Sequence, residues 1–333
     1  MSILFWSLVF IFSLIALVKG TDFLLESAEK IGLAMGLSPF IIGVTIVGIG
    51  TSLPELFSSL VATFKGATEI VAANAIGSNI ANILLIVGVS AILAKTLKVS
   101  KSLIDLDLPL LAISAVLVLG IVWDGKVVFA EAVLLLVAYG IYLLYTILHK
   151  EEDVENENEV LPSRKERRHH ITSSQMEGSI SANPKIKIKD LIFLVIGILG
   201  LVFGAKYLID AVINISEILQ IGTGVIAISA VAVGTSLPEL LVSGKAALSG
   251  KSEVALGNIF GSNVFNALVV IGLPGLFRTL IVDSPTLAIG VPVFVTATLL
   301  FVISGISRRI HIWEGAFYLL LYGLFIAKLF RLF

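Results

Sequence analysis

A nine-residue motif occurs twice in this chain of 333 residues, and the two copies lie 184 positions apart. The first copy, residues 48–56, reads GIGTSLPEL, and the second copy, residues 232–240, reads AVGTSLPEL. A second shared stretch follows at the same offset, as GSNIAN at 77–82 and GSNVFN at 261–266. All four stretches lie in long apolar runs, where polar groups are costly unless they serve a function. The pattern therefore predicts an internal duplication with one shared polar site.

The apolar runs are typical of a membrane protein. Hydrophobic residues make up 57% of the sequence and charged residues 14%, with a mean hydropathy of +1.04, whereas soluble domains are far more polar. A bilayer-spanning helix needs about 20 mostly apolar residues, and the chain offers such segments throughout. The ten segments are 2–20 (continuing to about 35), 38–64, 69–94, 103–122, 127–148, 190–218, 222–248, 252–276, 284–304 and 311–331.

A long polar stretch separates the fifth segment from the sixth. It divides the chain into a first five-helix repeat (1–148), a linker (149–189) and a second five-helix repeat (190–333). The linker is first acidic, then basic, then rich in Ser, Gly, Asn and Pro, and this composition predicts disorder. Because five is odd, the second repeat enters the membrane from the opposite side. We therefore predict an all-α integral membrane fold of ten transmembrane helices in two inverted five-helix repeats, a plan common in secondary transporters.

The placement of lysine and arginine predicts how the chain is oriented in the membrane. If the N-terminus lies outside, fifteen basic loop residues fall on the cytoplasmic side and five on the outer side. We therefore expect a multi-pass protein of the cell membrane, with both termini outside and the central linker in the cytoplasm. The chain contains no cysteine, which excludes disulfides and thiolate metal sites.

Each motif copy carries groups that can bind a cation. Glycine and proline open the helix and leave backbone carbonyls that need a partner in protein, water or an ion. Two hydroxyls and a carboxylate follow, and the next segment adds a serine and an asparagine spaced i, i+4, which share one helical face. The candidate ligands are Glu55, Glu239, Thr51, Thr235, Ser52, Ser236, Ser78, Ser262, Asn82 and Asn266, with the backbone carbonyls of Gly48 and Ala232.

These ligands are all hard oxygens, which suit calcium, magnesium, manganese and sodium. Many flexible oxygens favour calcium over magnesium, which requires a tight octahedron. Glu55 and Glu239 supply two negative charges, which one divalent cation or two sodium ions would neutralise. Left empty, the two desolvated carboxylates would repel each other, or one would take up a proton. A site that must hold either calcium or sodium predicts an antiporter, and proton competition is expected as well.

At these residues the chain resembles the sodium/calcium exchanger family of the cation/calcium antiporter superfamily, as a prokaryotic-type member with a short loop. Two Gly-Thr-Ser-Leu-Pro-Glu-Leu motifs and two Gly-Ser-Asn-x-x-Asn motifs carry the resemblance. It implies that Glu55 and Glu239 are the calcium ligands and that sodium binds to the same two residues. It also implies that the motif hydroxyls complete the sodium sites. Asn82 and Asn266 would line the centre. The resemblance also implies that the first and sixth helices slide past the other eight to alternate access.

The expected function is electrogenic exchange of sodium for calcium, with these ions as the transported species. No cofactor, nucleic acid or obligatory protein partner is expected. A proton/calcium exchanger is the main alternative, although the Asn-x-Thr-Glu pattern of proton-coupled relatives is absent. Potassium dependence is disfavoured because both Asn82 and Asn266 are asparagine, where potassium-dependent members carry an aspartate. A cation channel would need a continuous pore, and an intramembrane enzyme would need a nucleophile or metal-bound water that these segments do not offer.

Overall fold

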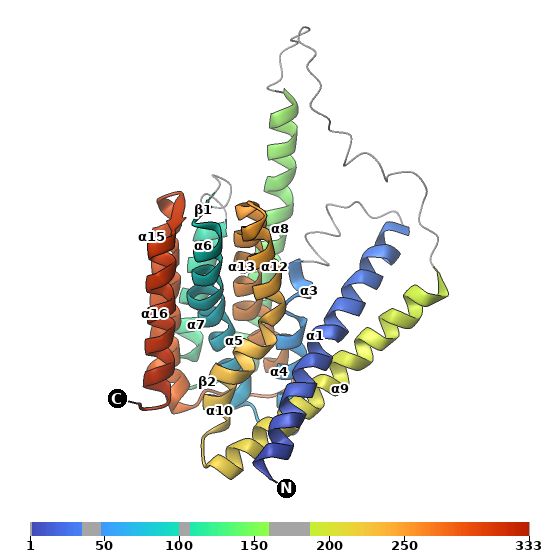
Figure 1. Cartoon of the computed structure of the whole chain (residues 1–333), viewed down its shortest axis with the longest axis vertical. Helices are drawn as coiled ribbons and strands as arrows, with labels where there is room; N and C mark the ends of the chain where they lie inside the picture. The colour runs from blue at the N-terminus through green and yellow to red at the C-terminus, as the bar shows by residue number, and fades with distance from the viewer. Residues whose placement is uncertain (1, 35–47, 100–106, 160–186, 333) are drawn as a thin grey trace.

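The computed structural model describes residues 2–34, 48–99, 107–159 and 187–332, and these are helical apart from loops and four strands of two or three residues (Figure 1). Within them, seven helices are long and apolar enough to cross a membrane, and an eighth is added if one bent pair is a single span. An all-α membrane fold is therefore confirmed. The expected segments 38–64 and 103–122 are described only in part, so the count of ten stays a prediction.

The first half begins with a helix that continues to residue 34, as expected from the sequence. The described part of the second segment starts at residue 48, and its residues 38–47 lie outside the described ranges. The helices of the first half are α1 (Ile3–Ala34), α3 (Gly48–Gly50), α4 (Leu53–Lys65), α5 (Glu69–Ile80), the π-helix η2 (Ala81–Val87), α6 (Gly88–Ala94), α7 (Leu108–Val122) and α8 (Phe129–Glu159).

The second half repeats this order of elements. Its helices are α9 (Ile188–Leu219), α10 (Thr223–Ile226), the π-helix η4 (Ala227–Val231), α11 (Ala232–Thr235), α12 (Leu237–Leu248), α13 (Ser252–Phe265), the π-helix η5 (Asn266–Val270), α14 (Ile271–Gly275), the π-helix η6 (Thr286–Gly290), α15 (Val291–Ile306) and α16 (Ile312–Leu329).

The end of α8 differs from the expected start of the linker. The sequence places the linker from residue 149, whereas α8 continues to Glu159. Residues 150–159 include one lysine and five glutamates, which have high helix propensity, and so the helix continues beyond its apolar part. The rest of the predicted linker, up to residue 186, lies outside the described residues.

Helices α1 and α9 pack closely on each other and stand beside the remaining helices (Figure 1). Glycine permits this approach, because a Cβ on Gly20 would lie 2.9 Å from the Gly197 carbonyl oxygen and from the Leu201 amide nitrogen. Gly204, which is 184 positions after Gly20, lies equally close to α1, since its Cβ would be 3.0 Å from Leu17. Each of these two counterpart glycines therefore lies against the opposite helix.

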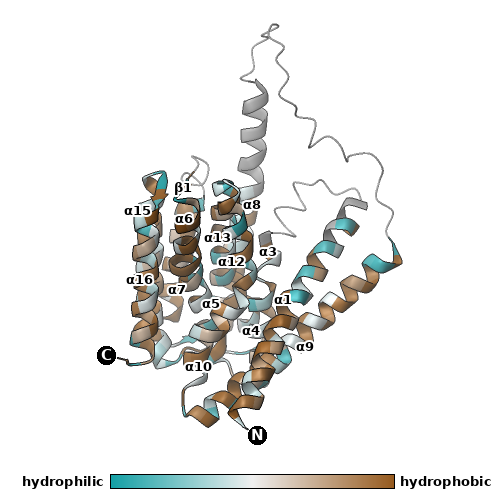
Figure 2. Cartoon of the chain, viewed as in Figure 1, coloured by the Kyte–Doolittle hydropathy of each residue, from teal (hydrophilic) through white to brown (hydrophobic). Residues whose placement is uncertain are grey.

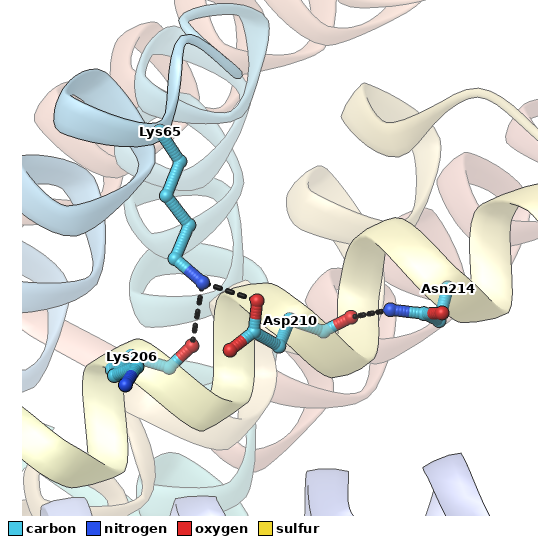
Figure 3. A network of polar contacts seen from close by, with 4 residues as sticks. All are labelled: Lys65, Lys206, Asp210 and Asn214. Atoms are coloured by element: carbon cyan, nitrogen blue, oxygen red, sulfur yellow. Dashed lines mark hydrogen bonds and ion pairs between the residues drawn. The ribbon is translucent and has the colours of Figure 1, made fainter.

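One ion pair links α9 to the end of α4. The Lys65 ammonium reaches the Asp210 carboxylate and also donates to the Lys206 carbonyl oxygen at 3.4 Å (Figure 3). The Asn214 amide donates to the Asp210 carbonyl oxygen at 2.8 Å, one turn further along α9. Of the ion pairs among the described residues, this one joins two helices, whereas the others join residues close together in the chain.

Two small antiparallel sheets join loops of the first half to loops of the second. They pair β1 (Thr96–Lys98) with β4 (Arg309–His311), and β2 (Lys126–Val127) with β3 (Leu280–Ile281). Leu97 pairs with Ile310, and the residues at the offset of 184, Ile281 and Lys126, also pair with each other. The duplication read from the motifs is therefore reproduced in the register of the strands.

Apolar side chains cover the outer helices (Figure 2). Exposed examples are Ile192 and Val195 on α9, and Phe317 and Leu320 on α16; an exposed apolar surface of this extent is typical of contact with lipid. The innermost spans are 69–94 and 252–275, each 78% buried over its most apolar stretch. These two counterpart spans form the centre of the molecule and carry the Gly-Ser-Asn motifs.

Candidate cation site

Each copy of the nine-residue motif lies at a break between two helices. Ser52 precedes α4 and Pro54 stands in its first turn, while Ser236 and Pro238 have the same places in α12. Proline is tolerated there because the first helical N–H groups have no partner within the helix. The helices on either side of the second break are bent by 45°. The interruption that glycine and proline predict is present in both copies.

The glutamates of the two motifs are fully buried and are held by the opposite halves of the chain. Glu55 and Glu239 are each 0% exposed and lie in the first turns of α4 and α12, where the helix dipole favours negative charge. Ser236 Oγ donates to Glu55 Oε1 at 2.9 Å, and Ser52 Oγ donates to Glu239 Oε1 at 2.9 Å. Each carboxylate is therefore bound by the serine of the other motif copy.

A second hydroxyl reaches each carboxylate from the helix that follows in the same half. Ser78 of α5 donates to Glu55 Oε1 at 3.5 Å, and Ser262 of α13 donates to Glu239 Oε1 at 3.2 Å. Four hydroxyl groups from both halves thus converge on two buried carboxylates. All of these residues were singled out from the sequence, and the structure brings them into one hydrogen-bonded network.

Four of the buried oxygens without a donor among the described residues belong to residues that the sequence singled out. They are Oε2 of Glu55 and of Glu239, and the amide oxygens of Asn82 and Asn266. A buried acceptor without a partner is destabilising. Carboxylate and amide oxygens are the ligands that calcium and other hard cations bind. Each half contributes one carboxylate and one amide oxygen to these four, so the arrangement can accept a cation.

The two asparagines lie where an α-helix continues as a π-helix. Asn82 belongs to η2 and Asn266 begins η5. Ser78 bonds to Glu55, whereas Asn82 Nδ2 donates to Asn263 Oδ1 at 3.4 Å. The serine and the asparagine of one motif therefore have different partners.

The two motif threonines are also held differently. Thr51 Oγ1 donates to Asn258 Oδ1 at 3.3 Å and lies 3.3 Å from Ser262 Oγ. Thr235 Oγ1 donates to the Val231 carbonyl oxygen at 3.1 Å. Thr51 therefore contacts the second half of the chain, and Thr235 bonds to the turn that precedes it and also lies beside the Glu55 carboxylate of the first half.

The two backbone candidates each begin a short helix, Gly48 in α3 and Ala232 in α11. The Ala232 carbonyl oxygen accepts the Ser236 N–H at 3.1 Å and the Thr235 hydroxyl at 3.4 Å. A carbonyl oxygen has two lone pairs, and in this arrangement that of Ala232 has partners within the protein, one of the three kinds of partner expected from the sequence.

Asn79 and Asn263 were not singled out from the sequence, although they lie inside the duplicated Gly-Ser-Asn motif. Asn79 Nδ2 donates to the Asn263 carbonyl oxygen at 3.1 Å, and these two residues are themselves 184 positions apart. A direct contact between counterpart residues marks the place where the two halves meet. The motif duplication was the signal that would have identified them.

Asn74 and Asn258 are a second pair that sequence reasoning missed. Asn74 Nδ2 lies 3.2 Å from the Glu55 carbonyl oxygen and 3.2 Å from Ser59 Oγ, and so it holds the first turns of α4. Asn258 Nδ2 donates to Ser243 Oγ at 3.1 Å. Both asparagines stand four residues before the serine of a Gly-Ser-Asn motif, which is the spacing that could have identified them.

The charge of the site is limited to two carboxylates. Among the described residues, no group of three or more His, Cys, Asp or Glu side chains is placed to hold a metal ion. The other ligands must therefore be neutral oxygens. Because the affinity for calcium depends on the number of charged ligands and on the rigidity of the site, this composition suits an ion that is bound and then released.

Comparisons with known proteins agree with these features. The family described as sodium/calcium exchanger protein matches residues 5–148 and 189–331. Sodium/calcium exchanger MaX1 of Methanosarcina acetivorans is 35% identical over 354 residues, covering 97% of this chain and 98% of that protein. Human sodium/potassium/calcium exchanger 5 is 25% identical over 359 residues, covering 85% of this chain and 71% of that protein.

A solved structure is similar over almost the whole chain. The sodium-calcium exchanger NCX_Mj, soaked with Na+ and Sr2+, superimposes with a TM-score of 0.64 at 30% sequence identity. The match covers 98% of this chain and 99% of that chain. Both halves are thus represented in known relatives, and the family match omits the central linker.

Proposed function

The chain belongs to the sodium/calcium exchanger family, and from this premise we propose that it exchanges sodium for calcium across a membrane by alternating access. The observation that carries the proposal is the pair of buried glutamates, each bound by a serine of the other half and each with one oxygen left without a donor. One calcium ion balances the two negative charges, as do two sodium ions. A third sodium ion would carry net positive charge, which makes the exchange electrogenic.

Glu55 and Glu239 are the calcium ligands in this proposal, and sodium shares them. The burial of both glutamates and the free oxygens of Asn82 and Asn266 support these roles. The hydroxyls of the two nine-residue motifs and of the two Gly-Ser-Asn motifs complete the sodium sites. They belong to Thr51, Ser52, Ser78, Thr235, Ser236 and Ser262, and the carbonyls of Gly48 and Ala232 are further sodium ligands.

The proposed architecture is a bundle of ten transmembrane helices in two inverted five-helix repeats. The equal offset of the two strand pairings and the reciprocal serine–glutamate bonds support this arrangement. Both termini lie outside and the linker lies in the cytoplasm, as the distribution of basic residues favours. The proposed cycle moves α1 and α9 against the remaining helices, and their close mutual packing supports movement as one unit.

The proposal describes a carrier and not an enzyme, and it involves no cofactor. The similarity to a human sodium/potassium/calcium exchanger makes potassium dependence an alternative to test. Asparagine at both Asn82 and Asn266 argues against it, because an aspartate would add the charge that a further cation needs. A proton/calcium exchanger on the same scaffold is the other alternative.

Calcium-45 uptake into proteoliposomes tests the proposal. The vesicles are loaded with sodium and diluted into sodium-free medium, with matched vesicles that contain only potassium or that carry only a proton gradient. We expect uptake to require the sodium gradient and to increase when the vesicle interior is positive, because net positive charge leaves with sodium. Addition of potassium to the sodium-loaded vesicles should not increase uptake.

The other outcomes would change the assignment. Uptake driven only by the proton gradient would place the chain with proton/calcium exchangers, and uptake that needs potassium together with sodium would indicate potassium co-transport. Uptake that is indifferent to every counter-ion would contradict an antiporter and favour a channel.

A further inference from the structure

The amide nitrogens of two counterpart asparagines have the same role in the two halves. Asn74 of α5 and Asn258 of α13 are 184 positions apart. Asn74 Nδ2 donates to Ser59 Oγ at 3.2 Å, and Asn258 Nδ2 donates to Ser243 Oγ at 3.1 Å. Ser59 and Ser243 are counterparts as well, and each stands one turn after a buried glutamate. Through their nitrogens, the two asparagines stabilise the same turn in each half.

The amide oxygens of the same two residues differ. Asn258 Oδ1 accepts the hydroxyl of Thr51 at 3.3 Å. Asn74 is 0% exposed, and its Oδ1 has no donor among the described residues. The hydroxyl at the counterpart of Thr51 belongs to Thr235, which donates instead to the Val231 carbonyl oxygen. One half therefore makes a threonine–asparagine bond that the other half lacks.

The orientation of the Asn74 amide follows from its neighbours. Its nitrogen lies 3.2 Å from the Glu55 carbonyl oxygen, which can only accept a hydrogen bond. The amide cannot therefore be turned over to satisfy its oxygen without placing two acceptors against each other. A buried amide oxygen without a donor is destabilising, so the asymmetry between the two halves has a cost in this arrangement.

An inverted-repeat architecture would explain this asymmetry. In such a carrier the two end states exchange the conformations of the two repeats, so a contact made by one repeat in one state is made by the other repeat in the opposite state. We propose that Asn74 and Asn258 are positioning residues whose amide oxygens accept hydrogen bonds from the two motif threonines in turn. This inference rests on the alternating-access function proposed above. Asn258 holds Thr51 in the arrangement seen here, and Asn74 holds Thr235 in the opposite one.

The exchange requires the Thr235 hydroxyl to leave the Val231 carbonyl oxygen. Threonine in a helix is found in two χ1 rotamers, because its hydroxyl can bond to the carbonyl of the preceding turn in one of them. Leaving Val231 for Asn74 replaces one hydrogen bond by another and satisfies the buried amide oxygen. Because both threonines are proposed sodium ligands, the switch would couple the shape of the ion site to the side on which it is open.

Cross-linking can measure the ratio of the two arrangements. The chain contains no cysteine, so a pair of introduced cysteines reports without background. Lys65→Cys combined with Asp210→Cys marks the present arrangement, because α4 and α9 meet at these two residues (Figure 3). A short bifunctional thiol reagent, applied to membranes at a sodium concentration that gives half-maximal linking, converts the fraction in this arrangement into a linked product.

We expect the two asparagine variants to shift this ratio in opposite directions. Asn258→Ala removes a bond made in the present arrangement and should lower the ratio about fivefold, the effect of one net hydrogen bond. Asn74→Ala removes a bond made in the opposite arrangement and should raise the ratio by a similar factor. The bonds made by the two nitrogens lie within one half each, so their loss cancels between the arrangements. Shifts in the same direction, or no shift, would overturn the proposal.

Threonine variants provide the matched control. Thr51→Val keeps the shape of the side chain but removes the hydroxyl, and it should lower the ratio as Asn258→Ala does. The double variant should shift no further than either single variant, and Thr51→Ser, which keeps the hydroxyl, should leave the cross-linking ratio unchanged. If an alanine variant does not fold, Asn74→Ser and Asn258→Ser, which leave a smaller polar group at the site, should give the same two signs.

Sodium-dependent calcium uptake by the same variants separates this switch from the proposed function. Opposite cross-linking shifts without sodium-dependent uptake in the unaltered chain would support the switch and contradict the ion assignment. Normal sodium-dependent uptake without opposite shifts would support the ion assignment and contradict the switch. A merely structural role for the asparagines would lower uptake in both variants without opposite shifts, and that result would also overturn the proposal.

Discussion

The helices that follow the two motif copies, α4 and α12, are alike at their first turns and unlike at their last. At the first turns, Glu55 and Glu239 have equal burial and exchange serine donors between the halves at the same distance of 2.9 Å. At the last turns, Lys65 binds Asp210 of α9. Ser249, which is 184 positions after Lys65, has no charge, and its backbone N–H donates to the carbonyl oxygen of Lys245.

The helices opposite these ends differ in the same way. Asp210 of α9 has Glu26 of α1 as its counterpart, and Glu26 pairs with Lys30 of its own helix at 2.6 Å. The comparison teaches that the two halves match at the buried carboxylates, which have equal burial and reciprocal serine donors, and differ at the helix ends, where one half makes an ion pair between two helices. In the proposed exchanger, the matching part would hold the ion and the differing part would favour one arrangement over the other.

The largest expected effect tests the equivalence of the two glutamates. Glu55→Gln and Glu239→Gln should each reduce calcium uptake to the level of empty liposomes, because each removes half of the charge that balances a divalent ion. The fold should persist, since a buried charge is removed and not created. Glu26→Gln on the exposed face of α1 is the matched control and should transport normally. Normal exchange by either buried-site variant would contradict the proposed site.

The serines that cross between the halves give the next test. Ser52→Ala and Ser236→Ala each remove a hydrogen bond to a buried carboxylate, and bonds to charged groups contribute about 1.5–3 kcal/mol. We expect both variants to raise the half-saturating calcium concentration by a factor of about 10 or more. Titration of initial uptake rates measures it, with Ser307→Ala in an exposed loop as control. A large difference between the two variants would break the equivalence.

The crossing of α1 and α9 should also respond unequally at its two counterpart glycines. Gly20→Ala should destabilise the protein by about 1–3 kcal/mol, because the new Cβ would meet backbone atoms of α9 at 2.9 Å. Gly204→Ala should cost somewhat less, because one of its two nearest neighbours at 3.0 Å is the Leu17 side chain, which can move, and the other is the Leu17 amide nitrogen. Thermal unfolding in detergent measures both. Gly140→Ala, which has open space around the added Cβ, should be neutral, and equal losses at Gly20 and Gly204 would contradict the comparison.

The smallest expected effect concerns the ends of the helices. Asp210→Asn removes the link to Lys65, but both side chains are partly exposed, 32% and 25%, so the loss of stability should be below about 1 kcal/mol. High salt should reduce the difference from the unaltered chain, because mobile ions screen exposed charges. Glu26→Gln should change stability less still, since its partner lies on the same helix. Thermal unfolding at low and high salt checks this ranking, and a reversed order would contradict it.

Several features of the protein followed from the sequence alone. The long apolar runs predicted a helical membrane fold, because helices satisfy their own backbone hydrogen bonds in lipid. Glycine and proline predicted breaks before Glu55 and Glu239, and these breaks are present. The duplicated motifs predicted that the oxygens of both halves meet, and the serine and glutamate side chains do so. These inferences depend on residue type and short spacing, which a sequence displays directly.

Other features were decided by the tertiary structure. The sequence could not show that Ser52 binds Glu239 and not the glutamate of its own motif, that Thr51 reaches Asn258, or that Asn82 donates to Asn263. Each contact joins residues 181 to 207 positions apart and depends on how their helices pack, and one sequence permits more than one such packing. The duplication gives the two halves the same ligand types, whereas the tertiary structure gives those residues different contacts, as for Thr51 and Thr235. The physical reason is that identical motifs have identical chemistry, but the packing around each copy places different neighbours beside it.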